Sequence, residues 1–285
     1  IDSNRGLNYF GVKSDDFIFW YEKEVEKIIE AISPDLVFGE STLFHELLVI
    51  NSCKKRNILF LHPSSTRYPS NRFSFYLYDT LTPFIGSNDQ MENEVAIKTV
   101  NAIAKRESLP DYIKVLKYNL SNIDWLKDKL RLSFGYLLGE KYNTPSPIHK
   151  FRINKSYQNN IREWEKLASN VDAIKPGFNV LYALQMQPEA NIDVWGYPNS
   201  NQTDVISRIL ESLNKGEKLI IKPNPKSKYE ISKQLLSVIK SNSDKVIPLT
   251  HSSKMDVLWD KIDLVITVTG TISMECMFDN KPLIM

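Results

Sequence analysis

The chain has little cysteine, no strong excess of charge of either sign and no long apolar run. It contains only two cysteines, Cys53 and Cys276, which lie far apart in the sequence, so neither a disulfide framework nor a metal cluster is predicted. A formal net charge of +2 argues against nucleic acid as the main partner, because that function normally shows as a strong basic excess on one face. No run approaches the roughly 18 apolar residues that span a bilayer. The lack of a disulfide framework predicts a reducing, cytoplasmic setting.

The length of the chain allows about two domains. It has 285 residues, of which 42% are apolar, enough to bury one or two substantial cores. It begins at Ile1 without a methionine and stops at Met285 inside or just after an expected strand. We therefore expect a piece of a longer protein.

Short β-type apolar runs alternate with helix-period segments in the last third of the chain. Strands are expected at 180–184, 218–221, 246–249, 264–268 and 282–285. Helices are expected between them, at 203–214, 228–241, 254–261 and 271–279. This order predicts a doubly wound parallel α/β sheet. Ligands of such sheets bind outside the carboxyl ends of the strands, so the loops after these runs are the candidate site.

The amino-terminal part has the pattern of a second, less complete α/β unit. An amphipathic helix at 15–32 precedes a strand at 34–40, a helix at about 42–54 and a strand at 57–62, and such a βαβ unit has parallel strands. From about 88 to 170 the pattern is helical and is broken near Pro145 and Pro147. Its clearest pieces are 92–105, 109–117, 125–138 and 157–168. We expect one domain over 1–175 and another over 176–285.

Two α/β units joined through a helical segment suggest the GT-B architecture, in which two Rossmann-like domains with parallel sheets face a cleft. Topology alone does not establish a function, because doubly wound sheets support many chemistries. The short motifs along the chain give more information about function than the topology does.

Five motifs follow one another at the expected strand ends. They are Pro34-Asp-Leu-Val-Phe-Gly-Glu40, Thr66-Arg67-Tyr-Pro-Ser-Asn-Arg72-Phe73, Leu184-Gln-Met-Gln-Pro-Glu189, Ile221-Lys-Pro-Asn-Pro225, and Thr269-Gly-Thr-Ile-Ser-Met-Glu275 followed by Asn280-Lys-Pro282. In these motifs the sequence resembles the capsule polysaccharide biosynthesis family, in particular its transferases that move Kdo or a related nonulosonic acid from a CMP-activated donor. The resemblance covers roughly 34–78 and 178–285. Family members often have Lys-x-His-Pro where this chain has Lys222-Pro-Asn-Pro225, and asparagine supplies no ionisable imidazole.

The resemblance implies a glycosyltransferase that adds an acidic sugar to a capsule or lipopolysaccharide glycan with retention of configuration. Glu189 matches the acidic residue that follows a glutamine by four positions in the family, and a carboxylate there can attack the anomeric carbon to form a glycosyl-enzyme. The competing interpretation is a structural carboxylate that binds loop amides. Glu40, at the end of an amino-domain strand, is the expected base for the acceptor hydroxyl.

The donor is expected on the loops at the strand ends. Thr269, Gly270 and Thr271 lie between a strand and a helix and would offer N–H groups and hydroxyls to a phosphate, unless Thr271 is only a helix cap. A rigid proline loop presents Lys222 and Asn224, with a solvated lysine as the alternative. The whole expected donor-binding set is Gln185, Lys222, Asn224, His251, Ser252, Thr269, Gly270, Thr271 and Glu275.

Two arginines complete the expected site. Arg67 and Arg72 could hold an acceptor's phosphate or a sugar carboxylate through the planar guanidinium group, or could be one surface and one structural arginine. No metal or other cofactor is required, because helix dipoles and cations can stabilise a departing nucleotide. The expected partners are a nucleotide sugar and a glycan or glycolipid acceptor, and a lipid-linked acceptor would bring peripheral contact with the inner membrane.

Two other interpretations remain open. One is a GT-B transferase that uses a UDP- or GDP-sugar, or a UDP-sugar epimerase of the same architecture. The other is a non-catalytic glycan-binding or assembly subunit with a degenerate site. Binding of CMP, UDP and GDP, compared side by side, distinguishes these classes.

Overall fold

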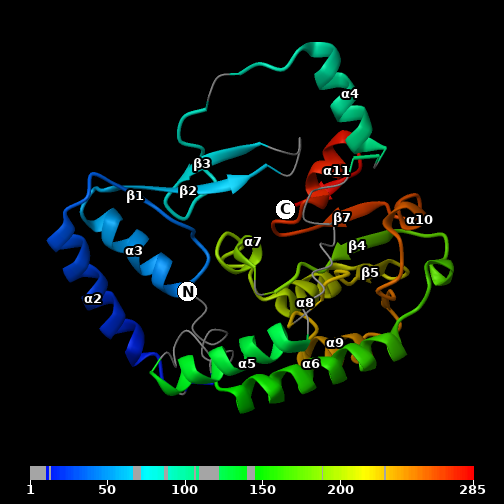
Figure 1. Ribbon diagram of the computed structural model, residues 1–285. Coiled ribbons are helices and arrows are strands. Elements are labelled where there is room, and N and C mark those ends of the chain that lie inside the picture. Colours follow the sequence, from blue (N-terminus) through cyan, green and yellow to red (C-terminus); the bar gives the residue numbers. More distant parts are fainter. Residues whose placement is uncertain are drawn as a thin grey trace. The chain divides into compact units, whose positions relative to one another are not determined.

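The computed structural model describes residues 11–12, 14–66, 72–86, 89–105, 107–108, 122–139, 145–187, 189–227 and 229–285. Contacts divide the chain into two compact units. The first comprises 1–64, 73–84 and 110–156, and the second comprises 65–72, 85–109 and 157–285. Parallel strand pairs and covering helices occur in both, which confirms the expected α/β class (Figure 1).

The second unit holds one five-stranded sheet. Its strands are β4 (Asn179–Ala183), β5 (Lys218–Lys222), β6 (Val246–Pro248), β7 (Leu264–Ile266) and β8 (Leu283–Ile284). They lie in the order β6-β5-β4-β7-β8, and all neighbouring pairs are parallel, as predicted. The chain starts at β4, winds outward to β6 and then crosses to β7. The order therefore reverses between β4 and β7, which is where doubly wound sheets bind ligands.

Short helices connect these strands: α7 (Ala190–Asp193), α8 (Gln202–Ser212), α9 (Lys233–Ser241), α10 (Met255–Trp259) and α11 (Ile272–Phe278). The helix expected at 228–241 begins only at Lys233, because Ser232 caps it by accepting a hydrogen bond from the Leu235 N–H at 3.0 Å. The sequence did not predict α7, which has one turn and is too short to show a helical period.

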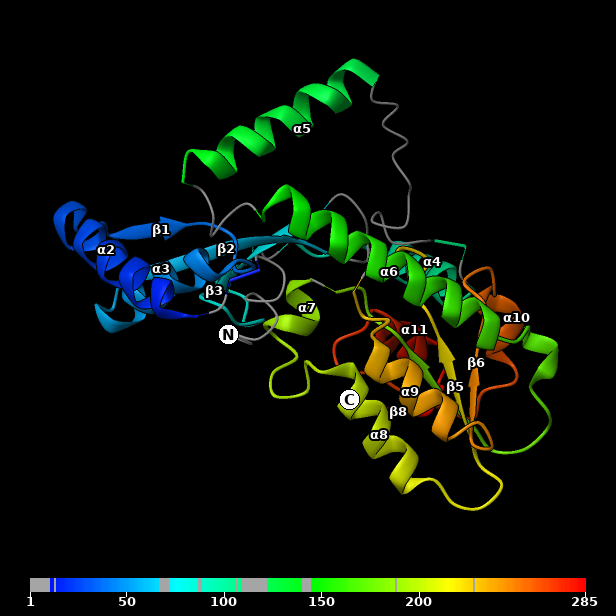
Figure 2. The ribbon, with the colours of Figure 1, turned by 90° about the horizontal axis from the view of Figure 1, so that it is seen from below.

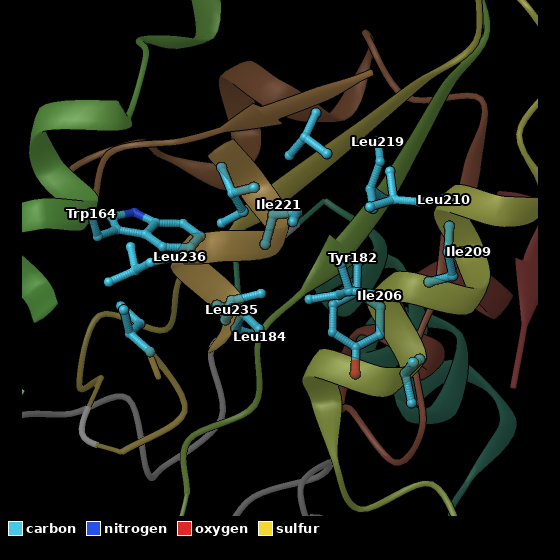
Figure 3. Close-up of a cluster of buried hydrophobic side chains, with 14 of the residues drawn as sticks. Trp164, Tyr182, Leu184, Ile206, Ile209, Leu210, Leu219, Ile221, Leu235 and Leu236 are labelled. Carbon is cyan, nitrogen blue, oxygen red and sulfur yellow. The ribbon is translucent and has the colours of Figure 1, made fainter. Parts of the chain in front are cut away.

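Apolar side chains cover both faces of the sheet. Val180 and Tyr182 of β4 lie on one face with residues of α8 and α9, which run side by side there (Figures 2 and 3). Leu181 points to the other face and packs with residues of α10 and α11. This alternation is what period-two strand geometry requires of a sheet buried on both sides.

A long helix, α6 (Pro147–Leu167), contributes to the first of these clusters. Trp164 is fully buried there (Figure 3). Its Nε1 donates a hydrogen bond to Leu249 O at 2.9 Å. The sequence placed this helix at 157–168 with Pro147 as a break, but the helix begins at Pro147, because the first helical position needs no N–H donor. Residues 157–175, expected in the first domain, pack within the second unit.

The first unit contains the expected βαβ unit. β1 (Leu36–Phe38) and β2 (Leu59–Ser65) pair in parallel around α3 (Phe44–Lys55), with α2 (Asp16–Ile32) before them. A further strand, β3 (Phe73–Leu77), is the other neighbour of β2 and was not predicted. Of the expected helical middle, α5 (Asn122–Leu137) belongs to this unit and α4 (Asn93–Ala104) belongs to the second. The helix expected at 109–117 lies outside the described residues. No helix in the described ranges is long and apolar enough to cross a membrane.

Candidate functional site

The carboxyl ends of β4, β5 and β7 bring together three of the expected site residues. Ala183 lies opposite Lys222 in the β4–β5 register, and the Leu184 N–H donates to Lys222 O at 2.9 Å. Gln185 therefore leaves β4 at the level where β5 ends. On the other side of β4, Thr269 follows β7, so the three loops share one edge of the sheet.

Gln185 and Thr269 join the two loops at the switch point. Gln185 Nε2 donates to Thr269 Oγ1 at 2.7 Å, and the Thr269 N–H donates to Gln185 Oε1 at 3.3 Å. The Thr269 hydroxyl in turn donates to Asn191 O at 2.9 Å. Both side chains are thus engaged within the protein, where they hold the loops in place.

Gly270 and Thr271 complete the β7–α11 loop. The Gly270 N–H donates to Thr267 Oγ1 at 3.0 Å, and a Cβ at position 270 would lie 2.5 Å from that oxygen, so close approach requires glycine. Thr271 is the N-cap of α11, yet its side chain makes no capping hydrogen bond. Within the described residues its half-buried hydroxyl has no partner, which favours a ligand over a capping role.

Lys222 is a buried cation at the end of β5. The residue is 7% exposed, and its ammonium group donates a hydrogen bond to Pro223 O at 3.3 Å. No carboxylate in the described ranges pairs with it. Burial lowers the pKa of the Lys222 ammonium group. An ammonium that is removed from water and lacks a counter-charge suits an anionic ligand.

Asn224, two residues further, shapes its own loop. Its Oδ1 accepts from the Lys226 N–H at 2.8 Å, and its main-chain oxygen accepts from the Ser227 hydroxyl at 2.8 Å. The side-chain NH₂ group has no hydrogen bond in the part of the chain that the structure describes. It is therefore available to a ligand beside Lys222.

His251 and Ser252 lie at the end of the edge strand, away from the switch point. The His251 N–H donates to Glu165 Oε1 at 3.1 Å, and His251 Nδ1 bonds the same oxygen. The Ser252 hydroxyl is bonded to Thr250 at 3.1 Å. β6 is three strand spacings from β7, about 14 Å, so these residues and Thr269 do not meet around one phosphate.

Glu189 lies next to the β7 loop. Its Oε1 accepts from Asn191 Nδ2 at 2.8 Å, and its N–H donates to Asp193 Oδ2 at 2.9 Å. Asn191 is also the residue whose main-chain oxygen binds the Thr269 hydroxyl, so one residue links Glu189 to Thr269. Glu275 lies half-buried in the first turn of α11.

The remaining expected residues do not belong to the loops of this edge. Glu40 is exposed after β1 in the first unit, and its role as a base opposite Glu189 stays a prediction. Arg72 is exposed, and its main-chain oxygen accepts from the Thr66 N–H at 2.9 Å. Arg67 lies outside the described residues.

Sequence reasoning missed the buried polar residues behind the site. Gln187 was only part of a motif, and Gln202 and Glu230 were not considered, although all three are buried. Gln202 begins α8, where polar residues are ordinary, so its position gave no signal.

Two hollows of about 500 and 520 Å³, along α4 and between α6 and α9, are not lined by the site loops. In the described ranges no three His, Cys, Asp or Glu residues gather as metal ligands.

No family model and no curated protein matches the sequence. Among solved structures, the chain is similar to UDP-GlcNAc 2-epimerase from Methanocaldococcus jannaschii, with 14% identity over 97% of this chain and 71% of that one, at a TM-score of 0.29. It is also similar to S. aureus MnaA with UDP, with 13% identity over 97% of this chain and 66% of that one, at a TM-score of 0.28. A third is a putative UDP-N-acetylglucosamine 2-epimerase from Listeria monocytogenes, with 14% identity over 97% of this chain and 66% of that one, at a TM-score of 0.30. The chain spans about two thirds of the length of the latter two, and likenesses this distant carry no conclusion about activity.

Proposed function

We propose that the carboxyl edge of the five-stranded sheet binds the phosphate of a nucleotide sugar and that the chain is part of a sugar-active enzyme. The observation that supports this is Lys222, a buried ammonium group with no carboxylate beside it in the described ranges. Burying such a charge costs several kcal/mol unless a ligand or partner replaces the lost water. A phosphate group supplies both the opposite charge and the hydrogen-bond acceptors.

Further donors lie at the same edge. The Asn224 NH₂ group is two residues from Lys222, and the Thr271 hydroxyl follows β7. β5 and β7 flank β4, so their ends are about 10 Å apart, a span that a nucleotide sugar can cover. In this pose Lys222 would stabilise the negative charge that develops on the phosphate as the nucleotide leaves the sugar.

Two reactions compete for this site. Transfer of an acidic sugar from a CMP donor, with Glu189 as nucleophile, rests on the sequence resemblance alone. The other is a UDP-sugar reaction, epimerisation or transfer, and UDP-GlcNAc is the substrate after which the similar solved structures are named. Glu189, which Asn191 connects to Thr269, suits either reaction, since both need a carboxylate near the sugar.

Isothermal titration with CMP, UDP, GDP and UDP-GlcNAc tests the proposal. We expect one nucleotide family to bind and Lys222→Met to weaken that binding at least about tenfold, because a hydrogen bond to a charged group contributes about 1.5–3 kcal/mol. Lys218→Met is the matched control, since Lys218 lies at the opposite end of the same strand. Absence of nucleotide binding, or equal affinity in Lys222→Met and wild type, would show that the proposal is wrong.

A further inference from the structure

Gln202, the first residue of α8, pairs with the main chain of Gln185 as a neighbouring strand would. Its Oε1 accepts from the Gln185 N–H at 2.8 Å, and its Nε2 donates to Gln185 O at 2.7 Å. Gln202 is 2% exposed. β4 has already ended at Ala183, so the side-chain amide fixes the backbone of Gln185 where no strand does.

One arm of hydrogen bonds leads from this pair to the β7 loop. With its backbone fixed, Gln185 points its own amide at Thr269, binding Oγ1 at 2.7 Å and the N–H at 3.3 Å. Thr269 is two residues before Thr271, the hydroxyl assigned to the ligand. The position of that hydroxyl therefore depends on the Gln202–Gln185 pair.

A second arm leads from Gln202 to Glu189. Gln202 Nε2 also donates to Gln187 Oε1 at 3.1 Å, and Gln187 Nε2 donates to Asp193 Oδ1 at 2.7 Å. The other carboxylate oxygen of Asp193 accepts from the Glu189 N–H at 2.9 Å. Glu230 Oε2 accepts a hydrogen bond from the Gln187 N–H at 3.2 Å and so fixes the main chain of Gln187.

We infer that Gln202 is the positioning residue that sets both halves of the site, the phosphate-side loop through Gln185 and the candidate carboxylate through Gln187. This inference rests on the proposed function for the identity of the ligand. A primary amide is needed because it donates and accepts at once; methionine of similar shape does neither, and glutamate cannot donate to Gln185 O or to Gln187 Oε1. The amides of Gln185, Gln187 and Gln202 each donate and accept within the protein, and buried hydrogen bonds of this kind hold their members rigidly.

The competing explanation is that Gln202 only stabilises the fold. Asn179 provides the matched control, because it is a buried amide at the opposite end of β4. Its Nδ2 donates to the main-chain oxygens of Lys175, Gly177 and Lys261 at 3.2, 3.2 and 3.0 Å, away from the site. Asn179→Leu and Gln202→Met should both lower the melting temperature.

Only Gln202→Met should also weaken nucleotide binding per folded molecule, by about tenfold, which corresponds to about 1.4 kcal/mol. A double-mutant cycle with Thr269→Val gives a readout that a merely structural role would not move. If Gln202 acts through the Thr269 arm, Thr269→Val alone should also weaken binding by about tenfold, and the double variant should lose about tenfold rather than the roughly 100-fold of two independent losses. Asn179→Leu combined with Thr269→Val should show no such coupling.

Additive losses in the Gln202–Thr269 cycle, or unchanged affinity in Gln202→Met, would overturn the inference. If Gln202→Met does not fold, Gln202→Glu provides the same comparison, because it keeps the shape and the Oε1 acceptor. Failure of the proposed function is recognised separately, by intact binding in Lys222→Met. If the wild-type protein binds no nucleotide, the cycle is measured by urea unfolding, where additive free energies would contradict the Gln202–Gln185–Thr269 chain.

Discussion

The Gln185 amide and the Thr269 hydroxyl, 2.7 Å apart, tie the ends of β4 and β7 together at the point where the strand order of the sheet reverses. The Thr269 hydroxyl is thereby used within the protein, because it also donates to Asn191 O. Thr271, two residues later, has no such bond within the described residues. Two threonines in one loop therefore have different roles.

Valine substitutions should separate these roles. Thr269→Val leaves the Gln185 amide without its acceptor and should lower the free energy of unfolding by about 1–3 kcal/mol. Thr271→Val should change unfolding by less than about 0.5 kcal/mol and weaken nucleotide binding by about 1.5–3 kcal/mol. Urea unfolding and isothermal titration of both variants check this. Equal stability losses in the two variants would contradict the assignment.

Removing the buried charge of Lys222 should stabilise the ligand-free protein. Lys222→Met keeps the length of the side chain but avoids the cost of an ammonium group that has no counter-charge. The variant should melt at a higher temperature than wild type at pH 7, yet nucleotide should raise its melting temperature less. A variant that is less stable than wild type would mean that Lys222 is a structural residue.

The advantage of Lys222→Met should also depend on pH. An unfolded lysine has a pKa of about 10.4, and burial lowers the pKa of Lys222 in the folded protein. Between these two pKa values the unfolded wild-type chain binds more protons than the folded one, so wild-type stability rises with pH. Urea unfolding from pH 7 to 10.5 should show the difference between wild type and Lys222→Met shrinking. A difference that stays constant or grows would contradict the burial argument.

The sequence predicted the sheet better than the site. Strands buried on both faces, such as Leu219–Ile221, are nearly continuous apolar runs, so their positions and parallel order could be derived. The places of Lys222 and Thr271 at strand ends could be derived as well, and their role in binding a ligand stays a prediction. The partners of Gln185 could not, because a polar residue such as Gln202 at the start of a helix gives the same pattern whether it is exposed or buried. The start of α6 was mispredicted for a related reason, because proline can either end a helix or, as Pro147 does, begin one.

Trp164 should be a major contributor to the stability of the second unit. It is fully buried against β6, its Nε1 donates to Leu249 O, and large-to-small changes at such sites cost about 3–5 kcal/mol. Trp164→Ala should therefore lower the free energy of unfolding by that amount, whereas Trp20→Ala, at a side chain that is 59% exposed on α2, should cost far less. Denaturant unfolding of the two full-length variants makes the comparison. Equal losses would show that α6 does not pack on this sheet.

Glu189 provides the test of chemistry. Its carboxylate accepts a hydrogen bond from Asn191 Nδ2 at 2.8 Å, and the main-chain oxygen of Asn191 accepts one from the Thr269 hydroxyl. Glu189→Gln keeps the size of the side chain and an oxygen for the Asn191 bond, but it removes the negative charge that either a nucleophile or a base requires. The variant should bind nucleotide with unchanged affinity, while turnover of the nucleotide sugar that wild type uses falls by orders of magnitude.

The control for Glu189→Gln is Glu211→Gln, an exposed position on α8, which should leave turnover unchanged.

Mass spectrometry distinguishes the two proposed reactions. With a CMP-sugar donor and no acceptor, a retaining transferase should accumulate a sugar ester on Glu189 as the anomeric carbon exchanges its bond to phosphate for a bond to the carboxylate and CMP departs. A UDP-sugar epimerase should show altered sugar stereochemistry and no adduct. Near-normal turnover by Glu189→Gln with every nucleotide sugar that wild type converts would remove Glu189 from the chemistry.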